Sequence, residues 1–347
     1  MPATVIIGGQ FGSEGKGKVA HRVAERAQAT VAIRVGGPNS GHTVITSDGV
    51  PVIFRHLPTA CLLAGVRSVL PPGSYLSVPT LLAEIARAKI GRTELAIDPN
   101  AWVVTQEDVE AEGKLRLSAS IGSTATGTGA ALARRISRSG PGTFAKHVQA
   151  FAPYLSDTAE LLADAMTRGE RVVVEGTQGF GLSLLHSEHY PYCTSRDTTA
   201  AAFLSESGLS PLDVDDVVMV IRAYPIRVAG SSGPLLNETT WEAISAESGS
   251  TSPLVEHTTV TKKIRRVARF DADVVRRAIA RNRPSSIVLN HLDYVDLMCG
   301  SQRCLTQRAS AFVRRVEQEI GREIDWLGFG PASLEERRFA PRKAVNR

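Results

Sequence analysis

Short apolar runs alternate with amphipathic segments along the chain, and this alternation is typical of buried parallel strands joined by helices. Near the N-terminus, strand-like runs at residues 5–7 and 30–33 flank a helical pattern at 18–27. Further apolar runs that fit the same sheet lie at 172–174, 217–220 and 286–289. The pattern predicts an α/β fold with a mostly parallel central sheet, whose loops carry ligands at the carboxyl ends of the strands.

Helical patterns and polar stretches fill the intervals between these runs. Helices are expected at residues 78–88, 151–168, 271–281 and 309–320. Stretches at about 104–145 and 229–266 are polar or rich in small residues, and we interpret them as mobile substrate loops. The chain contains no internal repeat and no linker-like stretch. Residues 1–347 are therefore expected to form one domain, a P-loop-like sheet flanked by helices with inserted loops or a subdomain.

The composition is that of an ordinary globular enzyme. Of the 347 residues, 43% are hydrophobic and 22% are charged, and no apolar run approaches the ~18 residues of a membrane helix. The first residues lead directly into a strand-like run rather than a signal peptide, which predicts a cytoplasmic protein with no membrane partner. The four cysteines lack the spacing of a zinc site or a disulfide framework, so we interpret all four as reduced.

The net charge of +5 is modest, and basic residues gather at 262–269 and near the C-terminus rather than in one long tail. No nucleic-acid recognition motif accompanies this charge, and a site for anionic small molecules would itself need cations. We therefore expect no nucleic acid among the partners.

Residues 8–18, Gly-Gly-Gln-Phe-Gly-Ser-Glu-Gly-Lys-Gly-Lys, follow the first apolar run directly. Closely spaced glycines let several backbone N–H groups point at one anion, Lys16 adds a charge, and the following helix turns its positive end toward the same place. The segment differs from a standard P-loop, since five residues separate Gly9 from Gly15 and Gly17 replaces the magnesium-binding hydroxyl. We predict a phosphate cradle, with a plain strand-to-helix turn as the alternative.

This segment resembles the signature of adenylosuccinate synthetases, whose usual form is Gly-x-Gln-Trp-Gly-Asp-Glu-Gly-Lys-Gly-Lys. Other stretches resemble motifs of that family in the same order, namely 36–43, 121–124 with Arg138, 175–179 with 190–195, 258–266 and 328–331. The chain is therefore identified as a member of the family over nearly its whole length. The resemblance implies a Mg²⁺-dependent ligase that phosphorylates a purine at its 6-oxygen and then replaces the phosphate by the amine of aspartate.

The matched motifs imply the roles of the catalytic residues, which are Ser13, Lys16, His42 and Gln178. Lys16 clamps phosphate, and His42 donates a hydrogen bond to the charge that develops between the γ-phosphate and the 6-oxygen. Gln178 holds the C6 oxyanion or the N1 edge of the base. The triphosphate-binding set is Gly12, Gly15, Lys16, Gly17, Gly41, His42, Thr43, Asn290, Asp293 and Gly330. The metal ligands are Ser13 and Gly41.

Position 13 departs from the family pattern. Ser13 stands where enzymes acting on inosine monophosphate have Asp, which is implied to remove the N1 proton of the base and to ligate magnesium. A serine hydroxyl cannot take that proton at neutral pH, but its smaller volume leaves room for an amino group at C2, the group that guanine carries. The chain thus resembles the phage-encoded branch of the family, which joins aspartate to dGMP on the route to diaminopurine DNA.

The proton acceptor that replaces Asp stays open at this point. Ser13 orients either N1 or a water molecule, and the proton leaves through solvent or through phosphate. Glu14 is next in the sequence and is expected to point elsewhere.

The resemblance also assigns the remaining ligands. The dGMP-binding set is Ser13, Asn39, Thr124, Arg138, Gln178 and Thr194, with Arg138 reaching the site of the neighbouring subunit in a homodimer. The aspartate-binding set is Thr258, Thr259, Val260, Thr261, Lys263 and Arg265. Lys263 replaces an arginine that lies near the ribose 2′-hydroxyl in ordinary members, a change compatible with a deoxyribose.

The triphosphate base pocket departs from the family as well. Ordinary members read the guanine of GTP with a Lys-x-Asp segment, and here His291 replaces the Lys before Asp293, which favours ATP or dATP. The expected product is N6-succino-2-amino-2′-deoxyadenylate, formed in the cytoplasm, or in the host cytoplasm if the chain is phage-encoded. The alternatives are an enzyme acting on inosine monophosphate, a drifted inactive member, and a non-catalytic nucleotide-binding regulator.

Overall fold

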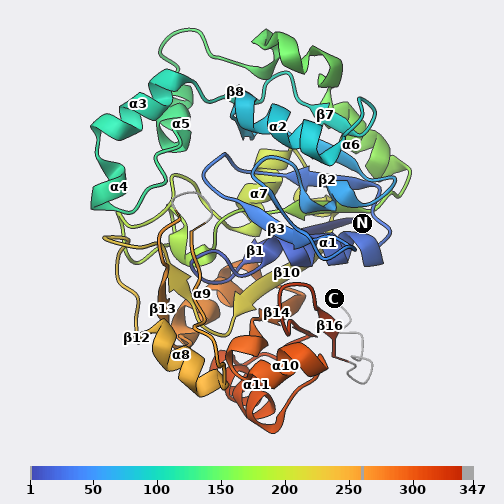
Figure 1. Cartoon of the computed structure of the whole chain (residues 1–347). Helices are drawn as coiled ribbons and strands as arrows, with labels where there is room; N and C mark the ends of the chain where they lie inside the picture. Colours follow the sequence, from blue (N-terminus) through green and yellow to red (C-terminus); the bar gives the residue numbers. More distant parts are fainter. Residues whose placement is uncertain (1, 259–261, 338–347) are drawn as a thin grey trace.

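A nine-stranded sheet forms the centre of the described part of the chain, residues 2–258 and 262–337 of this computed structural model (Figure 1). The strand order is β16-β15-β14-β10-β1-β9-β2-β5-β7, and all neighbours are parallel except β15 and β16. The strands are β1 (Ala3–Gly8), β2 (Val31–Arg34), β5 (Arg67–Leu70), β7 (Leu95–Ile97), β9 (Val172–Glu175), β10 (Val214–Arg222), β14 (Ser286–Asn290), β15 (Trp326–Leu327) and β16 (Glu335–Glu336). The expected mostly parallel α/β sheet is confirmed.

Helices and three small sheets surround the central sheet. The helices are α1 (Lys16–Arg26), α2 (Val78–Ala88), α3 (Gln106–Lys114), α4 (Leu117–Ser120), α5 (Thr128–Ser137), α6 (Thr158–Thr167), α7 (Ala200–Ser207), α8 (Trp241–Ser248), α9 (Ala272–Asn282), α10 (Leu297–Gln302) and α11 (Gln307–Ile320). The small sheets pair β3 (His42–Ile45) with β4 (Pro51–Phe54), β6 (Tyr75–Leu76) with β8 (Trp102–Val103), and β13 (Arg266–Ala268) with both β11 (Ile226–Arg227) and β12 (Glu238–Thr239). Among the described helices, none is both long enough and apolar enough to cross a bilayer.

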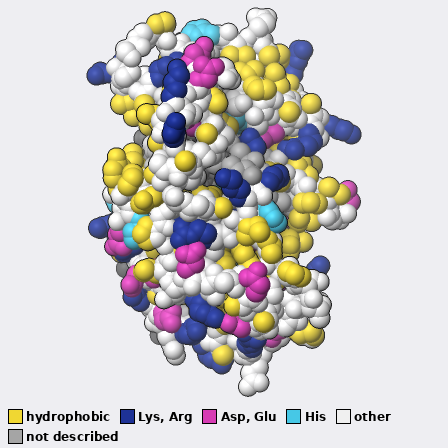
Figure 2. All heavy atoms as spheres, turned by 60° about the vertical axis from the view of Figure 1, so that its left-hand side comes forward, with side chains coloured by type: hydrophobic (Ala, Val, Ile, Leu, Met, Phe, Trp, Pro, Cys, Tyr) yellow, Lys and Arg dark blue, Asp and Glu magenta, His cyan; other side chains and the backbone are white. Residues whose placement is uncertain are grey.

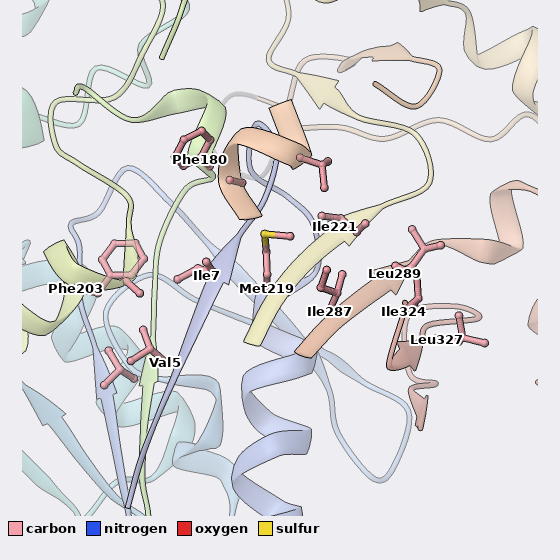
Figure 3. Packing of buried hydrophobic residues seen from close by; sticks show 14 of the residues in the cluster. Val5, Ile7, Phe180, Phe203, Met219, Ile221, Ile287, Leu289, Ile324 and Leu327 are labelled. Carbon is pink, nitrogen blue, oxygen red and sulfur yellow. The ribbon is translucent and has the colours of Figure 1, made fainter. Parts of the chain in front are cut away.

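Side chains alternate between the two faces of the central sheet, as strand geometry requires. Val5 and Ile7 of β1 pack on one face together with Met219 and Ile221 of β10, while Ile6 packs on the opposite face. Figure 3 shows the first face, on which the same packing continues through β14 to β15. Because both faces are buried, the strands are continuous apolar runs, which is why the sequence predicted several of them.

The order of strands reverses at β1. The chain passes from β1 through α1 to β2 on one side of β1, whereas β10 and β14 lie on its other side. α1 covers one face of the sheet, and α7, α9 and α11 cover the other. In such sheets a ligand binds beyond the carboxyl ends of the strands at the point of reversal. The loops that follow β1, β2, β9, β10 and β14 all open at this edge.

Two predictions about the segments outside the sheet need correction. The helix expected at 151–168 is broken, because Pro153 lies in a short 3-10 helix (Gln149–Tyr154) and α6 starts only after Asp157, which caps it. Both stretches interpreted as loops contain regular elements: 229–266 contains β12 and α8, and 104–145 contains α3, α4 and α5. Figure 1 shows these three helices together on one side, away from α10 and α11. The other predicted strands and helices are confirmed within a few residues at their ends.

Candidate active site

The loop after β1 folds around one of its own carboxylates. Gly12, Ser13 and Gly15 have φ angles of 87°, 57° and 90°, a left-handed conformation that turns the backbone tightly toward α1. Glu14 is fully buried beneath this turn and accepts hydrogen bonds from the N–H groups of Gln10 (3.2 Å) and Gly12 (2.8 Å). The loop therefore has the inward-pointing N–H groups of an anion cradle, and two of them hold the Glu14 carboxylate.

Lys16 pairs with the same carboxylate. Its Nζ lies 2.6 Å from Glu14 Oε2, and both side chains are buried. The last residue of β1 must be glycine, because a Cβ on Gly8 would lie 2.7 Å from Glu14 Oε2. A phosphate bound here would pair with Lys16 alongside Glu14 and would also be attracted by the positive end of the α1 dipole. Glu14 thus points inward, away from the substrate side of the loop.

His42, the first residue of β3, is buried in a network of charged side chains. Its Nδ1 lies 2.5 Å from Glu175 Oε1, and Arg34 Nη1 lies 2.7 Å from Nδ1 and 3.2 Å from Nε2. The other oxygen of Glu175 accepts hydrogen bonds from the N–H (2.7 Å) and the hydroxyl (2.8 Å) of Thr59. A Cβ on Gly17 would lie 2.9 Å from His42 Cβ, so the first turn of α1 closes the network. This close approach is the physical reason for a glycine where a P-loop has a hydroxyl.

Burial and charge keep His42 neutral. Burial, together with the nearby Arg34 charge, lowers the pKa of His42 to about 3 despite its hydrogen bond to Glu175. Burial opposes the charge of Glu175 as well, but the hydrogen bond from His42 and the Arg34 charge hold the pKa of Glu175 below its usual value. At neutral pH a neutral imidazole therefore faces an ionised carboxylate.

Two arginines hold Ser13. Arg265 donates a hydrogen bond to the Ser13 hydroxyl, and the fully buried Arg222 donates one to the Ser13 carbonyl at 2.9 Å. Glu256 offsets both positive charges, at 2.5 Å from Arg222 and 3.9 Å from Arg265. Burial opposes its charge, but Arg222 holds the pKa of Glu256 at about 2. Position 13 is therefore where the phosphate loop and the predicted aspartate loop meet.

The loop after β14 closes the opposite end of the site. Asn290 Nδ2 donates a hydrogen bond to the carbonyl of Glu14 at 2.7 Å. Lys18, from the first turn of α1, donates hydrogen bonds to the carbonyls of Gly330 (2.8 Å) and Ser333 (3.0 Å). The predicted triphosphate-binding segments around residues 15–18, 290–293 and 328–331 thus come together in space.

This end of the site also contains unpaired polar atoms. Among the described side chains, Asn290 Oδ1, His291 Nε2 and Asp293 Oδ1 are buried without a hydrogen-bond partner. Burial raises the pKa of Asp293 to about 6 and lowers the pKa of Lys18 to about 8. Burial also lowers the pKa of His291 well below its usual value, so the ring is neutral. Buried unpaired polar groups are expected where a ligand supplies the missing partners.

The predicted dGMP-binding residues lie on neighbouring loops. Gln178 follows β9, is half-buried and has a φ angle of 59°, a strained conformation often seen at functional sites. The Thr124 hydroxyl lies 3.2 Å from that of Thr126, just before α5. Asn39 is half-buried in the loop before β3, and Thr194 is half-buried as well.

Two contacts connect these loops with one another. The Ser40 hydroxyl lies 2.6 Å from that of Thr177, which joins the loop after β2 to the loop after β9. A Cβ on Gly37 would lie 2.7 Å from Thr128 Cγ2, which places the start of α5 against the loop after β2. The loops that carry Asn39, Gln178 and Thr124 are therefore adjacent.

Some predicted residues stand apart from this group. Arg138 is exposed at the C-terminal end of α5, with no described contact to the phosphate loop, and the Thr43 side chain is exposed in β3. In the predicted aspartate loop, Thr258 is buried and its hydroxyl accepts a hydrogen bond from the N–H of Lys263 at 3.0 Å. Thr259, Val260 and Thr261 lie outside the described residues.

The sequence analysis missed the buried charged residues of the site. Arg34, Glu175 and Arg222 are the last residues of β2, β9 and β10, and Glu256 lies two residues before the predicted aspartate loop, which starts at Thr258. A charged residue that ends an apolar strand-like run is the signal that could have identified the first three, because the carboxyl ends of parallel strands line the ligand crevice.

The predicted magnesium ligands are neutral oxygens. Among the described residues, no group of three or more His, Cys, Asp or Glu side chains is placed to hold a metal. Ser13 contributes a hydroxyl and Gly41, next to His42, a carbonyl. Mg²⁺ commonly takes most of its ligands from substrate phosphates and water, so these two oxygens fit an ion that the triphosphate brings with it.

The surface of the molecule is charged in a way that suits anionic ligands. Figure 2 shows one face on which several Lys and Arg side chains gather toward the middle. Such a concentration of positive charge attracts phosphate-bearing molecules to that face.

Known proteins resemble the chain along almost all of its length. The family model described as adenylosuccinate synthetase matches residues 5–143 and 142–300. An adenylosuccinate synthetase of Methanococcus aeolicus is 35% identical over 338 residues, which cover 95% of this chain and 97% of that protein. The corresponding protein of Archaeoglobus fulgidus is 33% identical over 336 residues, with 95% and 96% covered.

Two solved structures resemble the fold. The succinoaminodeoxyadenylate synthetase (PurZ) of cyanophage S-2L, bound to dGMP and to dATP as an energy donor, has a TM-score of 0.82 and 30% identity, with 96% of this chain and 95% of that chain covered. The fully ligated adenylosuccinate synthetase of Plasmodium falciparum has a TM-score of 0.85, with 97% and 100% covered. At 20% identity the second likeness establishes the fold alone.

Proposed function

Because the chain belongs to the adenylosuccinate synthetase family of carbon–nitrogen ligases, we propose that it joins L-aspartate to C6 of dGMP at the expense of ATP or dATP. The product is N6-succino-2-amino-2′-deoxyadenylate, a precursor of diaminopurine DNA. The observation that carries the proposal is Ser13, placed where the phosphate and aspartate loops meet and held there by Arg265. The similarity to the cyanophage enzyme, solved with dGMP and dATP, supports it.

Two bond exchanges make up the reaction. First the 6-oxygen of the base attacks the γ-phosphorus, the bond to the β-phosphate oxygen breaks, the nucleoside diphosphate leaves, and N1 gives up its proton to solvent or to phosphate. Then the aspartate amine attacks C6, phosphate leaves with the 6-oxygen, and the nitrogen loses a proton. In this proposal Lys16 offsets charge on the phosphates, His42 bonds to the moving phosphoryl group, and Gln178 holds the C6 oxygen. Mg²⁺, when held by Ser13, Gly41 and the triphosphate, would supply further positive charge.

The size and charge of the side chain at position 13 are the basis of the proposed choice of base. An aspartate there would fill space beside N1 and C2 and place a second carboxylate near Glu256, with Arg265 as its partner. Ser13 leaves that space open, and its hydroxyl can accept a hydrogen bond from an exocyclic amine. A purine with a 2-amino group is accordingly the better fit.

The proposed donor is an adenine nucleotide. His291 is neutral and buried, and the unpaired atoms of Asn290 and Asp293 are hydrogen-bond acceptors. The 6-amino group of adenine is a donor that these acceptors can bind, and a neutral ring at 291 lacks the fixed charge that a lysine would offer to the guanine oxygen.

The exposed Arg138 fits the proposed homodimer, in which it binds dGMP in the partner subunit.

The first rival function is synthesis of adenylosuccinate from inosine monophosphate, the activity that the names of the archaeal relatives describe. The second, from another class, is a nucleotide-binding regulator without catalysis. The rivals differ in measurable ways, since the first releases phosphate with inosine monophosphate and the second binds nucleotide without aspartate-dependent phosphate release.

The test is phosphate release with Mg²⁺, aspartate and either ATP or dATP, comparing dGMP, GMP and inosine monophosphate. We expect turnover with dGMP and at least about 10-fold less with inosine monophosphate. Ser13→Asp is expected to reverse that preference, whereas Ser13→Ala, which keeps the space but not the hydroxyl, retains it at a lower rate. Turnover with inosine monophosphate alone would reject the proposed substrate.

A further inference from the structure

Arg227, the last residue of β11, carries a buried positive charge that no carboxylate of the described residues offsets. Only 3% of its surface is exposed, and the groups that act on its charge are the like-charged Arg266 and the thiol of Cys193. The other buried arginines of the described chain each pair with a glutamate, namely Arg34 with Glu175, Arg196 with Glu206 and Arg222 with Glu256. A buried cation without a counter-ion is costly, so other contacts must hold this one in place.

Two backbone carbonyls and one aromatic ring hold the Arg227 guanidinium. Its Nη1 donates hydrogen bonds to the carbonyl of Tyr192 at 3.1 Å and to the carbonyl of Ser232. Its Cζ lies over the ring of Phe11, 4.4 Å from the ring centroid. Nε and Nη2 have no hydrogen-bond partner among the described residues. The carbonyl dipoles and the negative face of the ring therefore take the place of a carboxylate.

Two of these contacts lie on loops that carry predicted dGMP-binding residues. Phe11 belongs to the phosphate loop, two residues before Ser13, and Tyr192 lies two residues before Thr194. The guanidinium of Arg227 thus connects, through one ring and one carbonyl, two loops that are far apart in the sequence.

The third contact extends the connection to the loop that carries Thr124. A Cβ on Gly122 would lie 3.0 Å from Ser232 Cβ, so the stretch before Thr124 packs directly on the segment that accepts from Arg227. A Cβ on Gly233 would lie 2.4 Å from Tyr192 Cβ and 3.1 Å from Arg227 Nη1. Because the backbones approach so closely, a displacement of one loop must displace the next.

We propose that Arg227 is a positioning residue of the monophosphate site: it holds the phosphate loop, the 190–195 loop and the 228–233 loop against one another, and so fixes Ser13 and Thr194 relative to dGMP. The inference rests on the proposed function for the identity of that nucleotide. Arg227 itself need not touch the substrate, because its three contacts are all with the protein.

The two nucleotides should depend on Arg227 to different extents. The phosphate loop has anchors of its own, since Arg222 donates a hydrogen bond to the Ser13 carbonyl and Asn290 donates one to the Glu14 carbonyl. Two of the three contacts of Arg227 lie instead on the predicted monophosphate side. Its loss should therefore weaken binding of dGMP more than binding of the triphosphate.

The first experiment is Arg227→Met, which keeps an unbranched apolar stem and removes the charge and the donors. We expect the KM for dGMP to rise about 10-fold or more and the KM for ATP or dATP to change less than about 3-fold. Arg227→Lys, which keeps a cation near the ring without the planar fork, should lie between wild type and Arg227→Met. An unchanged KM for dGMP, or an equal rise in both KM values, would overturn the inference.

A double-mutant cycle with Phe11→Leu tests whether Arg227 acts through the ring. Phe11→Leu alone should raise the KM for dGMP, and it examines the same contact if Arg227→Met does not fold. The double variant should match the poorer single variant within about 2-fold, because either substitution already breaks the contact. Effects that multiply would show that the two side chains act independently and would contradict the proposal.

Arg315→Met is the matched control. Arg315 of α11 also lies over an aromatic ring, that of Phe312, with 5.0 Å from Cζ to the centroid, but α11 carries no predicted substrate residue. Both KM values should stay at the wild-type level in this variant, and a matching rise in the KM for dGMP would refute the assignment to Arg227.

Calorimetric titration with dGMP, GMP and inosine monophosphate separates this inference from the proposed function. The preference of the wild type among the three tests the proposed substrate. The ratio of Kd between Arg227→Met and wild type, for whichever monophosphate binds, tests the positioning role. Wild-type binding of inosine monophosphate alone would reject the proposed substrate, whereas a Kd ratio near one would reject the role of Arg227.

Discussion

The two ends of the predicted triphosphate site are built differently. Around His42, both oxygens of Glu175 have donors, and within the described residues only Arg34 Nε of this network lacks a partner. Around the loop after β14, by contrast, Asn290, His291 and Asp293 each bury a polar atom that no described group satisfies. One end is pre-organised by the protein itself, and the other has unpaired polar atoms that, under the proposed function, the ligand satisfies. Rate should therefore depend on the first end and nucleotide selection on the second.

The largest expected effect tests the pre-organised end. In Gly17→Ala the new Cβ would lie 2.9 Å from both His42 Cβ and the Thr43 carbonyl, and 3.0 Å from Thr59 Cγ2. The helix start and His42 must move apart, and a displacement near 1 Å at reacting groups can cost about 100-fold in rate. We expect kcat to fall by about that factor in the phosphate-release assay while the protein stays folded by circular dichroism.

Gly113→Ala in α3 is the control for this substitution. No heavy atom lies within 4 Å of the position of its added Cβ. Alanine should stabilise that helix by about 0.4–1 kcal/mol and leave kcat unchanged. Equal rates for the two variants would show that contact with His42 does not set the rate.

A smaller effect is expected at the end that the ligand completes. Asp293→Asn removes the charged acceptor proposed to bind the donor base, and a hydrogen bond to a charged group contributes about 1.5–3 kcal/mol. The KM for ATP or dATP should rise about 10- to 100-fold, with a smaller change in kcat. The readout is initial rate against nucleotide concentration at saturating dGMP and aspartate.

Asp296→Asn, three residues further on, is its control. Asp296 caps α10 by accepting a hydrogen bond from the N–H of Met298, and asparagine caps helices about as well as aspartate. The KM for ATP or dATP should therefore stay at the wild-type value in this variant. If both substitutions raised KM equally, the effect would belong to the loop as a whole rather than to Asp293.

The smallest expected effect is on stability without nucleotide. Burial raises the pKa of Asp293 to about 6, so between about pH 4 and 6 the folded state binds a proton that the unfolded state does not. This contribution to stability grows as pH falls through 6, reaching about 1 kcal/mol at pH 5.5 relative to pH 8. Urea unfolding at pH 5.5 and pH 8 measures this change in the free energy of unfolding, which should be present in the wild type and absent from Asp293→Asn. The same pH dependence in both proteins would contradict the raised pKa.

The sequence predicted the parts of the fold whose physical cause is local. β1, β2, β9 and β14 are apolar runs long enough to stand out, and α2 was located to the residue. β5 is as long as β2 but begins with Arg67 and Ser68, and β7 has only three residues, so neither forms an apolar run that stands out. The helices α3 and α5 lie in the stretch 104–145, where Ser, Thr and Gly around them led to the prediction of a loop.

Contacts between distant residues stabilise those missed helices. Arg134 of α5 pairs with Asp108 of α3 at 2.8 Å, and Glu112 accepts hydrogen bonds from the N–H groups of Gly127 (2.8 Å) and Gly129 (2.6 Å). The sequences of the two helices carry local signals as well, since α3 has acidic residues in its first turn and Lys114 in its last, and α5 is rich in Ala and Arg, so the prediction missed signals that were present.

The site shows the same division between local and distant causes. The glycine loop and the residues around Lys16 and His42 could be predicted because their motifs are contiguous. The network of Arg34, His42 and Glu175 could not, since it joins residues more than a hundred positions apart along the chain. The roles of Gln178, Thr124 and the aspartate loop are predictions that rest on their motifs.

The central place of β1 has a consequence for how the protein is made. Ala3 pairs with Val172 on one side and Val5 with Val217 on the other, so β1 has to wait until β9 and then β10, far along the chain, have been synthesised. At roughly 5–20 residues per second, the ribosome needs on the order of 10 to 40 s to deliver the second of them. Until then an apolar segment and the phosphate loop behind it stay unpaired. Nascent chains released early should therefore expose that segment, bind chaperones and lack any nucleotide affinity.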